Sequence, residues 1–173
     1  MQKALFLDRD GVINIEKDYL HKIEDFEFID GIIELCHYYM HHNYLIVVVT
    51  NQSGIARGYY SEEDFNELTA WMIGSFYERG VEITHVYHCP HHPDISGECS
   101  CRKPKPGMLF NAKKDYNIDL ENSVLVGDKE RDIEAGLASG LTNTYLFDAL
   151  NKIHISKATK IINKLEDIYN VNT

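Results

Sequence analysis

The stretch DRDGV (residues 8–12) places two aspartates one residue apart, directly after the apolar run KALFL (residues 3–7). Side chains on an extended backbone repeat with a period of two, so Asp8 and Asp10 are expected to point the same way. Carboxylates this close repel each other unless a cation lies among them. The spacing therefore indicates a cation site, and the alternative is an ordinary polar turn, in which aspartate is common.

Further polar side chains follow two other apolar runs. Thr50 follows YLIVVV (residues 44–49), and Asp128 and Lys129 follow SVLVG (residues 123–127). Ligands of open α/β sheets bind beyond the carboxyl ends of the strands, where such residues would meet. Because these residues converge from separate segments, a functional site is favoured over a set of unrelated polar loops.

Phosphoryl transfer is the chemistry that these groups suit best. The carboxylates of Asp8, Asp10 and Asp128 would gather around one Mg²⁺, whose octahedron waters and a substrate phosphate would complete. Lys103 and Lys129 would supply fixed positive charge to the other phosphate oxygens. Positioning and charge neutralisation are the main demands of this reaction, and its uncatalysed rate is very low, so many converging groups are expected.

The elements that must position these residues alternate between strands and helices. The apolar runs are short and nearly continuous, as in parallel strands covered on both faces. Strands are predicted at residues 3–7, 44–49, 83–89, 123–127 and 142–147. Helices are predicted near residues 32–40, 61–80, 106–117, 131–140 and 156–169, and the residues after Tyr169 are expected to fray. This order predicts an α/β, three-layer doubly wound (Rossmann-like) mostly parallel sheet.

The whole chain sets further limits. Its 173 residues suit a single domain, residues 1–173, without room for a separate cap domain. A formal net charge of −10 argues against binding to nucleic acid or to an anionic membrane. No segment is long and apolar enough to span a bilayer, and charges interrupt the N-terminus too early for a secretory signal. We therefore expect a cytoplasmic protein with reduced cysteines and, by default, a monomer.

Three of the four cysteines lie in the loop HCPHHPDISGECSCRKPKPG (residues 88–107). Two close pairs, Cys89 with His91 and Cys99 with Cys101, form a Cys₃His set that suits tetrahedral Zn²⁺. A disulfide is the alternative, but it is disfavoured in the cytosol and would leave one of these thiols unpaired. A closed Cys₃His site has no open position for water, so the zinc would be structural.

Two assignments near this loop have alternatives. His92 competes with His91 as the fourth ligand, whereas His88 directly precedes the first cysteine and is expected to point elsewhere. Cys36 lies on the apolar face of a predicted helix and is interpreted as a small core residue. The loop ends at residues 102–103, so zinc would fix two cations, an arginine and a lysine, over the phosphate site.

Four segments together resemble the motifs of the haloacid dehalogenase superfamily of phosphatases. DRDGV is similar to its first motif, DxDx[TV], and VVVTN to its second, an apolar strand that ends in Thr or Ser. Lys103 in CRKPKPG corresponds to the third motif, and VGDKERD to the fourth. The four segments cover most of the chain and are specific as a set.

The resemblance implies a covalent mechanism. Asp8 would attack phosphorus and form an aspartyl-phosphate, and Asp10 would protonate the leaving oxygen and then deprotonate the attacking water. Thr50 and Lys103 would hold the phosphoryl oxygens. Mg²⁺ would be bound by the Asp8 carboxylate, the Asp10 main-chain carbonyl and Asp128.

The resemblance also assigns the substrate side, which short loops must form in a chain without a cap. Arg102 would hold the distal part of a sugar phosphate. Arg57 is either a further substrate contact or a solvated loop arginine. Asp132 either supports the metal ligands or is a plain helix-surface carboxylate. The remaining residues on the substrate side would be Glu16, Lys17, Asp18, Tyr19, Thr50, Asn51, Gln52 and Ser53, with Lys129 beside the phosphate.

Within the superfamily, the zinc loop is similar to two groups, the histidinol-phosphate phosphatases and the D-glycero-D-manno-heptose-1,7-bisphosphate phosphatases. The second group matches over nearly the full length, through DYLHKIEDFEFIDGI, TNQSGIARGYYSEEDF, CRKPKPGM and VGDKERDIEAG. The loop between His91 and Cys99 is nearer in length to that of the first group. The second group implies removal of the C7 phosphate of a sugar bisphosphate, a step of ADP-heptose synthesis for lipopolysaccharide core or S-layer glycan.

Three alternative functions stay open at this point. The first is a histidinol-phosphate phosphatase on the same scaffold, which turnover of the two substrates would distinguish. The second is a non-catalytic, zinc-stabilised binding module, which predicts no Mg²⁺-dependent phosphate release. The third is a phosphotransferase or mutase that uses the same aspartyl-phosphate.

Overall fold

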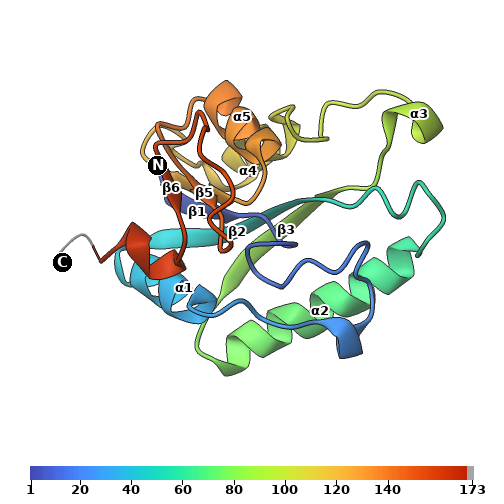
Figure 1. The fold of residues 1–173 in the computed structure, drawn as a ribbon, viewed down its shortest axis with the longest axis horizontal. Helices are drawn as coiled ribbons and strands as arrows, with labels where there is room; N and C mark the ends of the chain where they lie inside the picture. The colour runs from blue at the N-terminus through green and yellow to red at the C-terminus, as the bar shows by residue number, and fades with distance from the viewer. Residues whose placement is uncertain (171–173) are drawn as a thin grey trace.

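The computed structural model describes residues 1–170, whose strands form one six-stranded sheet (Figure 1). Every strand pair is parallel, and the strand order is β3-β2-β1-β4-β5-β6. The strands are β1 (Lys3–Leu7), β2 (Tyr44–Asn51), β3 (Ile83–Cys89), β4 (Val124–Gly127), β5 (Asn143–Phe147) and β6 (Lys160–Ile162). The strand order reverses between β1 and β4, which is where doubly wound sheets bind ligands. The predicted fold class and all five predicted strands are confirmed.

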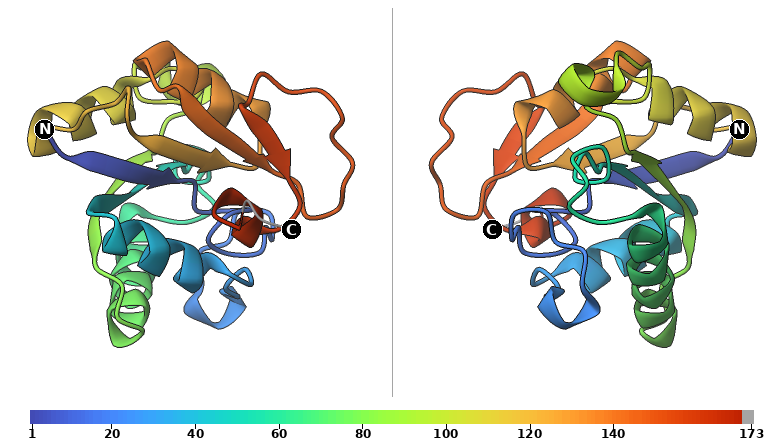
Figure 2. Two further views of the ribbon diagram at one scale, coloured as in Figure 1. Left: turned by 90° about the vertical axis from the view of Figure 1, so that its left-hand side faces the viewer. Right: turned by 90° about the vertical axis from the view of Figure 1, so that its right-hand side faces the viewer.

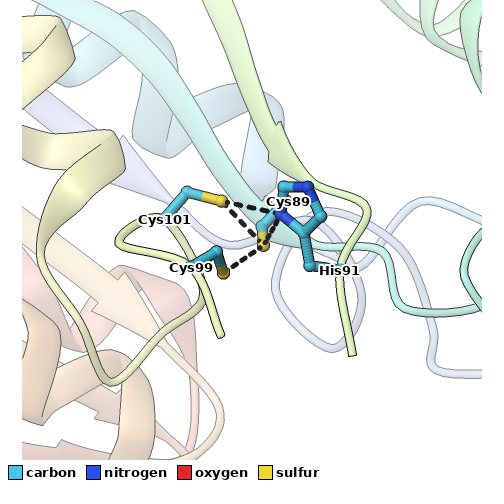
Figure 3. Close-up of side chains that lie close together, drawn as sticks. All are labelled: Cys89, His91, Cys99 and Cys101. Atoms are coloured by element: carbon cyan, nitrogen blue, oxygen red, sulfur yellow. Dashed lines mark hydrogen bonds between the residues drawn. The ribbon is translucent and has the colours of Figure 1, made fainter. Parts of the chain in front are cut away.

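Helices cover both faces of this sheet (Figures 1 and 2). The helices α1 (Ile32–His41) and α2 (Glu62–Glu78) lie on one face, and α4 (Gly107–Tyr116) and α5 (Glu130–Ser139) lie on the other. Strand side chains alternate accordingly, since Leu5 packs with the first pair of helices and Phe6 with the second. The shorter helical segments are η1 (Ile23–Asp25), α3 (Pro93–Ser96) and η2 (Leu165–Ile168). Cys89, labelled in Figure 3, ends the edge strand β3 and begins the loop to α4.

The N-terminus of α2 shows why sequence spacing locates this helix well. The Ser61 hydroxyl accepts the Asp64 N–H (3.1 Å), and the Asp64 carboxylate accepts the Ser61 N–H (2.8 Å). This reciprocal cap satisfies two N–H groups that the first helical turn leaves free. The helix ends at Glu78, and Gly80, predicted as the C-cap, lies one residue beyond the actual cap with φ +77°.

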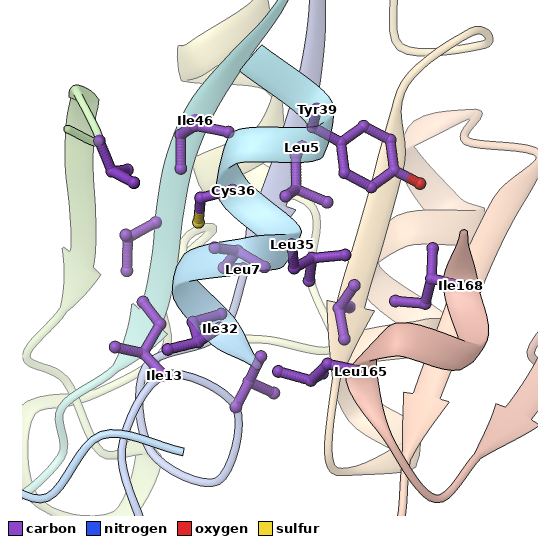
Figure 4. Close-up of a cluster of buried hydrophobic side chains, with 14 of the residues drawn as sticks. Leu5, Leu7, Ile13, Ile32, Leu35, Cys36, Tyr39, Ile46, Leu165 and Ile168 are labelled. Carbon is purple, nitrogen blue, oxygen red and sulfur yellow. The ribbon is translucent and has the colours of Figure 1, made fainter. Parts of the chain in front are cut away.

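Residues 156–169 do not form the predicted helix. They form β6, which pairs with β5, and the 3-10 turn η2. Ile162, Leu165 and Ile168 are all buried, and Figure 4 labels the last two in the core. A helix and a strand followed by a turn both bury residues at this spacing, and β-branched Ile161 and Ile162 favour the strand. The predicted fraying after Tyr169 concerns residues 171–173, which lie outside the described part of the chain.

Two further expectations concern the body of the fold. Cys36 is buried in the core cluster of Figure 4, and burial raises the pKa of its thiol to about 12, so it is an uncharged core residue as predicted. Within residues 1–170, no helix has the length and apolar character of a membrane span, and the strands form a single sheet.

Candidate active site

The carboxyl ends of three neighbouring strands supply the centre of the candidate site. Asp8 directly follows β1, Thr50 lies near the end of β2, and Asp128 directly follows β4. The Asp8 N–H donates to the Val126 carbonyl (3.1 Å), so the first turn after β1 remains attached to β4. Oxygen atoms of Asp8, Asp128 and Asp132 all lie within 4.8 Å of one another. Sheet topology therefore brings together carboxylates that are more than a hundred residues apart.

Asp132 belongs to this cluster and does not lie on a helix surface. It occupies the first turn of α5 and is 1% exposed. One of its carboxylate oxygens accepts the main-chain N–H groups of Asp128 (3.2 Å) and Lys129 (3.0 Å). Asp132 thus shapes the turn from which Asp128 projects, and of the two roles weighed for it, the supporting one agrees with this geometry.

A single buried lysine lies among these carboxylates. The Lys103 ammonium is 3.0 Å from the Asp8 carboxylate and 2.8 Å from that of Asp132, and it donates to the Val49 carbonyl (2.7 Å). Burial alone would lower the pKa of Lys103, but the facing carboxylates of Asp132 and Asp8 raise it above its ordinary value. The lysine therefore remains a fixed positive charge beside Asp8.

The carboxylates themselves carry an excess of negative charge. Burial raises the pKa of Asp8 well above its ordinary value, Lys103 opposes this shift, and the nearby Asp132 and Asp128 add to it. Burial and the Asp132 charge also raise the pKa of Asp128. Two buried carboxylates and the partly exposed carboxylate of Asp128 face one buried ammonium, an arrangement that a further cation would stabilise.

The Asp10 side chain is not part of this carboxylate cluster. Its carboxylate accepts hydrogen bonds from Gln52 Nε2 (3.0 Å), Arg9 Nη2 (3.1 Å) and Asn14 Nδ2 (3.1 Å). The reason is local, because the Ile13 N–H donates to the Arg9 carbonyl (2.8 Å), and the chain therefore turns before Asp10 could continue the strand. The side chains of Asp8 and Asp10 nevertheless line the same cavity.

Gly11 makes the close approach of this turn to Asp128 feasible. Its φ is +91°, which side chains other than hydrogen rarely allow, and a Cβ atom there would lie 2.2 Å from an Asp128 carboxylate oxygen. The glycine of the DRDGV motif is therefore required by the structure, because any side chain at this position would clash with Asp128.

A polar cavity of about 360 Å³ opens beside Asp8. Most residues predicted for the substrate side line it. Two do not: Thr50 is buried outside this lining, and the Lys17 ammonium contacts the Asp25 carbonyl (2.8 Å) and the Glu27 carboxylate (3.3 Å). Tyr60 and Arg131 also line the cavity but were not identified from sequence, although Arg131 lies inside VGDKERD. The full lining is Asp8, Asp10, Glu16, Asp18, Tyr19, Asn51, Gln52, Ser53, Arg57, Tyr60, Arg102, Lys129 and Arg131.

The loop of residues 16–19 has a constrained backbone. Asp18 and Tyr19 have φ values of +28° and +59°, a region that costs free energy for residues other than glycine. The Tyr19 ring lies beneath the guanidinium of Arg57 (5.8 Å) and packs edge-on against Tyr59 (4.7 Å between ring centroids). Burial raises the pKa of Glu16, and the Asp10 charge adds to this shift. The aromatic and cation–π contacts of Tyr19 hold this wall of the cavity in spite of its strained backbone.

A second cluster lies at the end of β3 (Figure 3). The Cys101 sulfur is 2.9 Å from the Cys89 sulfur and 3.3 Å from Nδ1 of His91, and the sulfurs of Cys89 and Cys99 are 3.6 Å apart. All four ligand atoms lie within 4.8 Å of one another. Three sulfurs and one imidazole nitrogen at this spacing are compatible with a tetrahedral zinc site.

The other two histidines of this loop face elsewhere. His92 Nδ1 accepts the N–H of Asp94 (3.3 Å) at the start of α3, so His91 and not His92 joins the cluster. His88 pairs with Glu62 (2.9 Å) and stacks on Phe65, as expected for a residue that points away.

Known proteins are similar to this chain in sequence and in fold. A family model described as HAD-hydrolase-like matches residues 100–163. The chain is 52% identical over 150 residues to the D-glycero-alpha-D-manno-heptose-1,7-bisphosphate 7-phosphatase of Campylobacter jejuni, covering 87% of this chain and 85% of that protein. It is 53% identical over 150 residues to the D-glycero-beta-D-manno-heptose-1,7-bisphosphate 7-phosphatase of Pasteurella multocida, covering 84% and 82%. A solved structure is also similar: the crystal structure of D,D-heptose 1,7-bisphosphate phosphatase from B. bronchiseptica, complexed with magnesium and phosphate. The two sequences are 28% identical. The folds superpose with a TM-score of 0.83 over 96% of this chain and 95% of that chain.

Proposed function

This chain belongs to the family of D-glycero-D-manno-heptose-1,7-bisphosphate 7-phosphatases, which are HAD-like phosphoric monoester hydrolases, and we propose that it removes the C7 phosphate of a D-glycero-D-manno-heptose 1,7-bisphosphate. The observation that carries the proposal is the contact of the buried Lys103 ammonium with Asp8 (3.0 Å) beside a polar cavity. The reaction uses a nucleophilic carboxylate and fixed positive charge at one phosphate position, and Asp8 and Lys103 supply both.

The reaction proceeds in two displacements at phosphorus. In the first, an Asp8 oxygen forms a bond to phosphorus, the bond from phosphorus to the C7 oxygen breaks, and Asp10 gives its proton to that oxygen. In the second, water attacks the same phosphorus, Asp10 takes a proton from the water, and Asp8 is released as a carboxylate together with inorganic phosphate. Lys103 and Thr50 hold the phosphoryl oxygens through both steps.

The donor set fits Mg²⁺. The Asp8 and Asp128 carboxylates and the Asp10 main-chain carbonyl would hold the ion, and these hard oxygen ligands are the type that Mg²⁺ prefers. The excess of buried carboxylates over buried ammonium groups supports this assignment. When bound, the ion neutralises charge that the phosphate and the Asp8 carboxylate would otherwise concentrate in one place.

The second cluster fits a structural Zn²⁺. Cys89, His91, Cys99 and Cys101 would complete a closed tetrahedron and leave no position for a reacting water. The ion would order the loop whose end supplies Arg102 and Lys103. The Arg102 guanidinium donates to the His91 carbonyl (3.3 Å), which supports a link between this loop and the substrate side.

The arginines of the cavity suit the phosphate that is retained. We propose that Arg102 holds the C1 phosphate while loop residues 16–19 and 50–53 contact the sugar. Lys129, whose ammonium is 3.2 Å from the Asp128 carboxylate, would lie beside the reacting phosphate. A bisphosphate brings several negative charges to a chain of net charge −10, so local cations are required to bind it. The retained 1-phosphate would serve ADP-heptose synthesis, which feeds lipopolysaccharide core or S-layer glycan.

Phosphate release in the presence of Mg²⁺ tests the proposal. We expect cleavage of either or both anomers of the heptose 1,7-bisphosphate with a kcat/KM at least about tenfold above that for histidinol phosphate, because the second phosphate adds charge-assisted contacts. Phosphorus NMR should show the 1-phosphate intact, and Asp8→Asn should abolish turnover. Preference for histidinol phosphate would identify that activity instead, and the absence of phosphate release from every substrate would indicate a binding module.

A further inference from the structure

Tyr60 and Gln52 form a buried chain of hydrogen bonds that ends on the acid–base carboxylate. The Tyr60 hydroxyl donates to Oε1 of Gln52, and Nε2 of Gln52 donates both to the Asp10 carboxylate (3.0 Å) and to the Thr50 hydroxyl (2.9 Å). Gln52 is 2% exposed and Tyr60 7% exposed. One amide therefore contacts both the residue that would transfer protons and a residue that would hold the phosphoryl group.

The orientation of that amide depends on Tyr60. A glutamine amide can turn over, and the reversed orientation would present Oε1 to the Asp10 carboxylate, where two acceptors would face each other. The Tyr60 hydroxyl stabilises the productive orientation because it supplies a donor to Oε1. Burial raises the pKa of Tyr60 to about 12, so the hydroxyl keeps its proton.

The Tyr60 ring is itself held firmly in place. It stacks on the imidazole of His21 (5.1 Å between ring centroids, 9° between planes). Gly54 lies directly beneath the ring, and a Cβ atom there would be 2.2 Å from the ring carbon Cε1. The absence of a side chain at residue 54 allows the hydroxyl to reach Gln52.

We propose that Tyr60 is a positioning residue that acts through Gln52 to hold the Asp10 carboxylate and the Thr50 hydroxyl in their working orientations. The proposal rests on the function proposed above, in which Asp10 transfers protons and Thr50 holds the phosphoryl group. It assigns Gln52, predicted from resemblance as a substrate contact, a role in orienting the catalytic groups.

A double-mutant cycle tests the proposal in steady-state kinetics on the heptose bisphosphate. Tyr60→Phe removes one hydroxyl and is expected to lower kcat about three- to tenfold, the loss of one hydrogen bond, with KM within about twofold. Gln52→Met is expected to lower kcat by about 10², because it removes the donor to both groups. Tyr60→Phe should then have no further effect in the Gln52→Met background, since Tyr60 acts only through Gln52.

Gly54→Ala provides a second test, in which the side chains of Tyr60 and Gln52 are both kept. The added methyl group displaces the Tyr60 ring, so this variant should reproduce the kcat loss of Tyr60→Phe and should not add to it. Tyr77→Phe, at a tyrosine that is 75% exposed on α2, is the matched control and should match the wild-type protein. Thermal unfolding of each variant confirms that it is folded.

Two outcomes overturn the proposal while leaving the phosphatase assignment intact. One is a wild-type kcat in Tyr60→Phe and Gly54→Ala, and the other is a Tyr60→Phe effect that is the same with and without Gln52. Asp10→Asn distinguishes failure of this proposal from failure of the proposed function. Full activity in Asp10→Asn would contradict the proposed function itself.

Discussion

Asn51 holds the main chain of Lys103 by two hydrogen bonds. Its Nδ2 donates to the Lys103 carbonyl (3.1 Å), and its Oδ1 accepts the Lys103 N–H (3.0 Å). Asn51 is the last residue of β2 and pairs in register with Cys89 on β3. Asn51 therefore joins the end of the sheet to the lysine beside Asp8 through its side chain, and to the first cysteine of the cluster through strand pairing.

Asn51→Ala is expected to lower kcat about tenfold, with a smaller change in KM. Two hydrogen bonds of about 1 kcal/mol each are lost, and the main chain from which Lys103 reaches Asp8 becomes less constrained. Asn51→Asp keeps the acceptor for the N–H but repels the carbonyl, so an intermediate loss is expected. Steady-state kinetics measure both. An increase in KM with unchanged kcat would show instead that Asn51 serves mainly as a substrate contact.

Mg²⁺ is expected to raise the melting temperature more at neutral pH than in mildly acidic buffer. Burial raises the pKa of Asp8 and Asp128 in the metal-free fold. Groups with raised pKa values stabilise the fold below their unfolded pKa, and this contribution is lost as pH rises through the folded values. Mg²⁺ binds the ionised carboxylates, so its stabilising effect grows over the same range.

Thermal unfolding with and without Mg²⁺ across a pH series measures this effect. Asp8→Asn is the control, because it removes one titrating ligand and should reduce the Mg²⁺-dependent increase at neutral pH. A Mg²⁺ effect of the same size at every pH would contradict the assignment of these carboxylates as the ligands.

Cys99→Ser is expected to lower both zinc content and activity while the sheet remains folded. The loop that ends at Lys103 would lose its metal, and kcat should fall by about tenfold or more because the phosphate-binding cation is less well placed. Metal analysis, far-UV circular dichroism and kinetics measure the three quantities. Cys36→Ala is the matched control, since Cys36 lies in the core in Figure 4; it should keep its zinc and lose about 1 kcal/mol of stability. Full activity in zinc-free Cys99→Ser would refute the link between this loop and catalysis.

Arg131→Gln is expected to raise KM about three- to tenfold for the bisphosphate and to leave kcat nearly unchanged. Arg131 is an exposed cation of the cavity, near Lys129, and a distal phosphate would contact it through solvent-screened attraction. A sugar monophosphate that carries only the C7 phosphate serves as the comparison substrate, and its KM should not change. Equal increases in KM for both substrates would place Arg131 at the reacting phosphate instead.

The parts of the site that follow from sheet topology were predictable from sequence. Asp8 and Asp128 each follow an apolar run, and parallel strands place their carboxyl ends at one edge. The cysteine cluster was predictable because ligand spacing does not depend on the rest of the fold. The sequence left its histidine open between His91 and His92. In the structure His92 caps α3, and His91 lies with the three cysteines.

Other features depend on contacts that spacing does not encode. Asp10 does not continue β1, because the Ile13 N–H donates to the Arg9 carbonyl and closes a local turn. The segment of residues 156–169 has the same apolar spacing as a helix, and pairing with β5 decides its structure. Tyr60 reaches Gln52 only because Gly54 leaves space beneath its ring, which no local pattern reveals.

The turn of residues 92–98 closes on itself between the two halves of the cysteine cluster. The His92 N–H donates to the Ser96 hydroxyl (2.9 Å), the Ser96 N–H donates back to the His92 carbonyl (2.9 Å), and Ile95 is 53% exposed. Since cluster residues anchor this turn at both ends, we expect that a change in its length would leave Lys103 in place. It is also the natural place to graft an affinity tag or a fluorescent reporter into this enzyme.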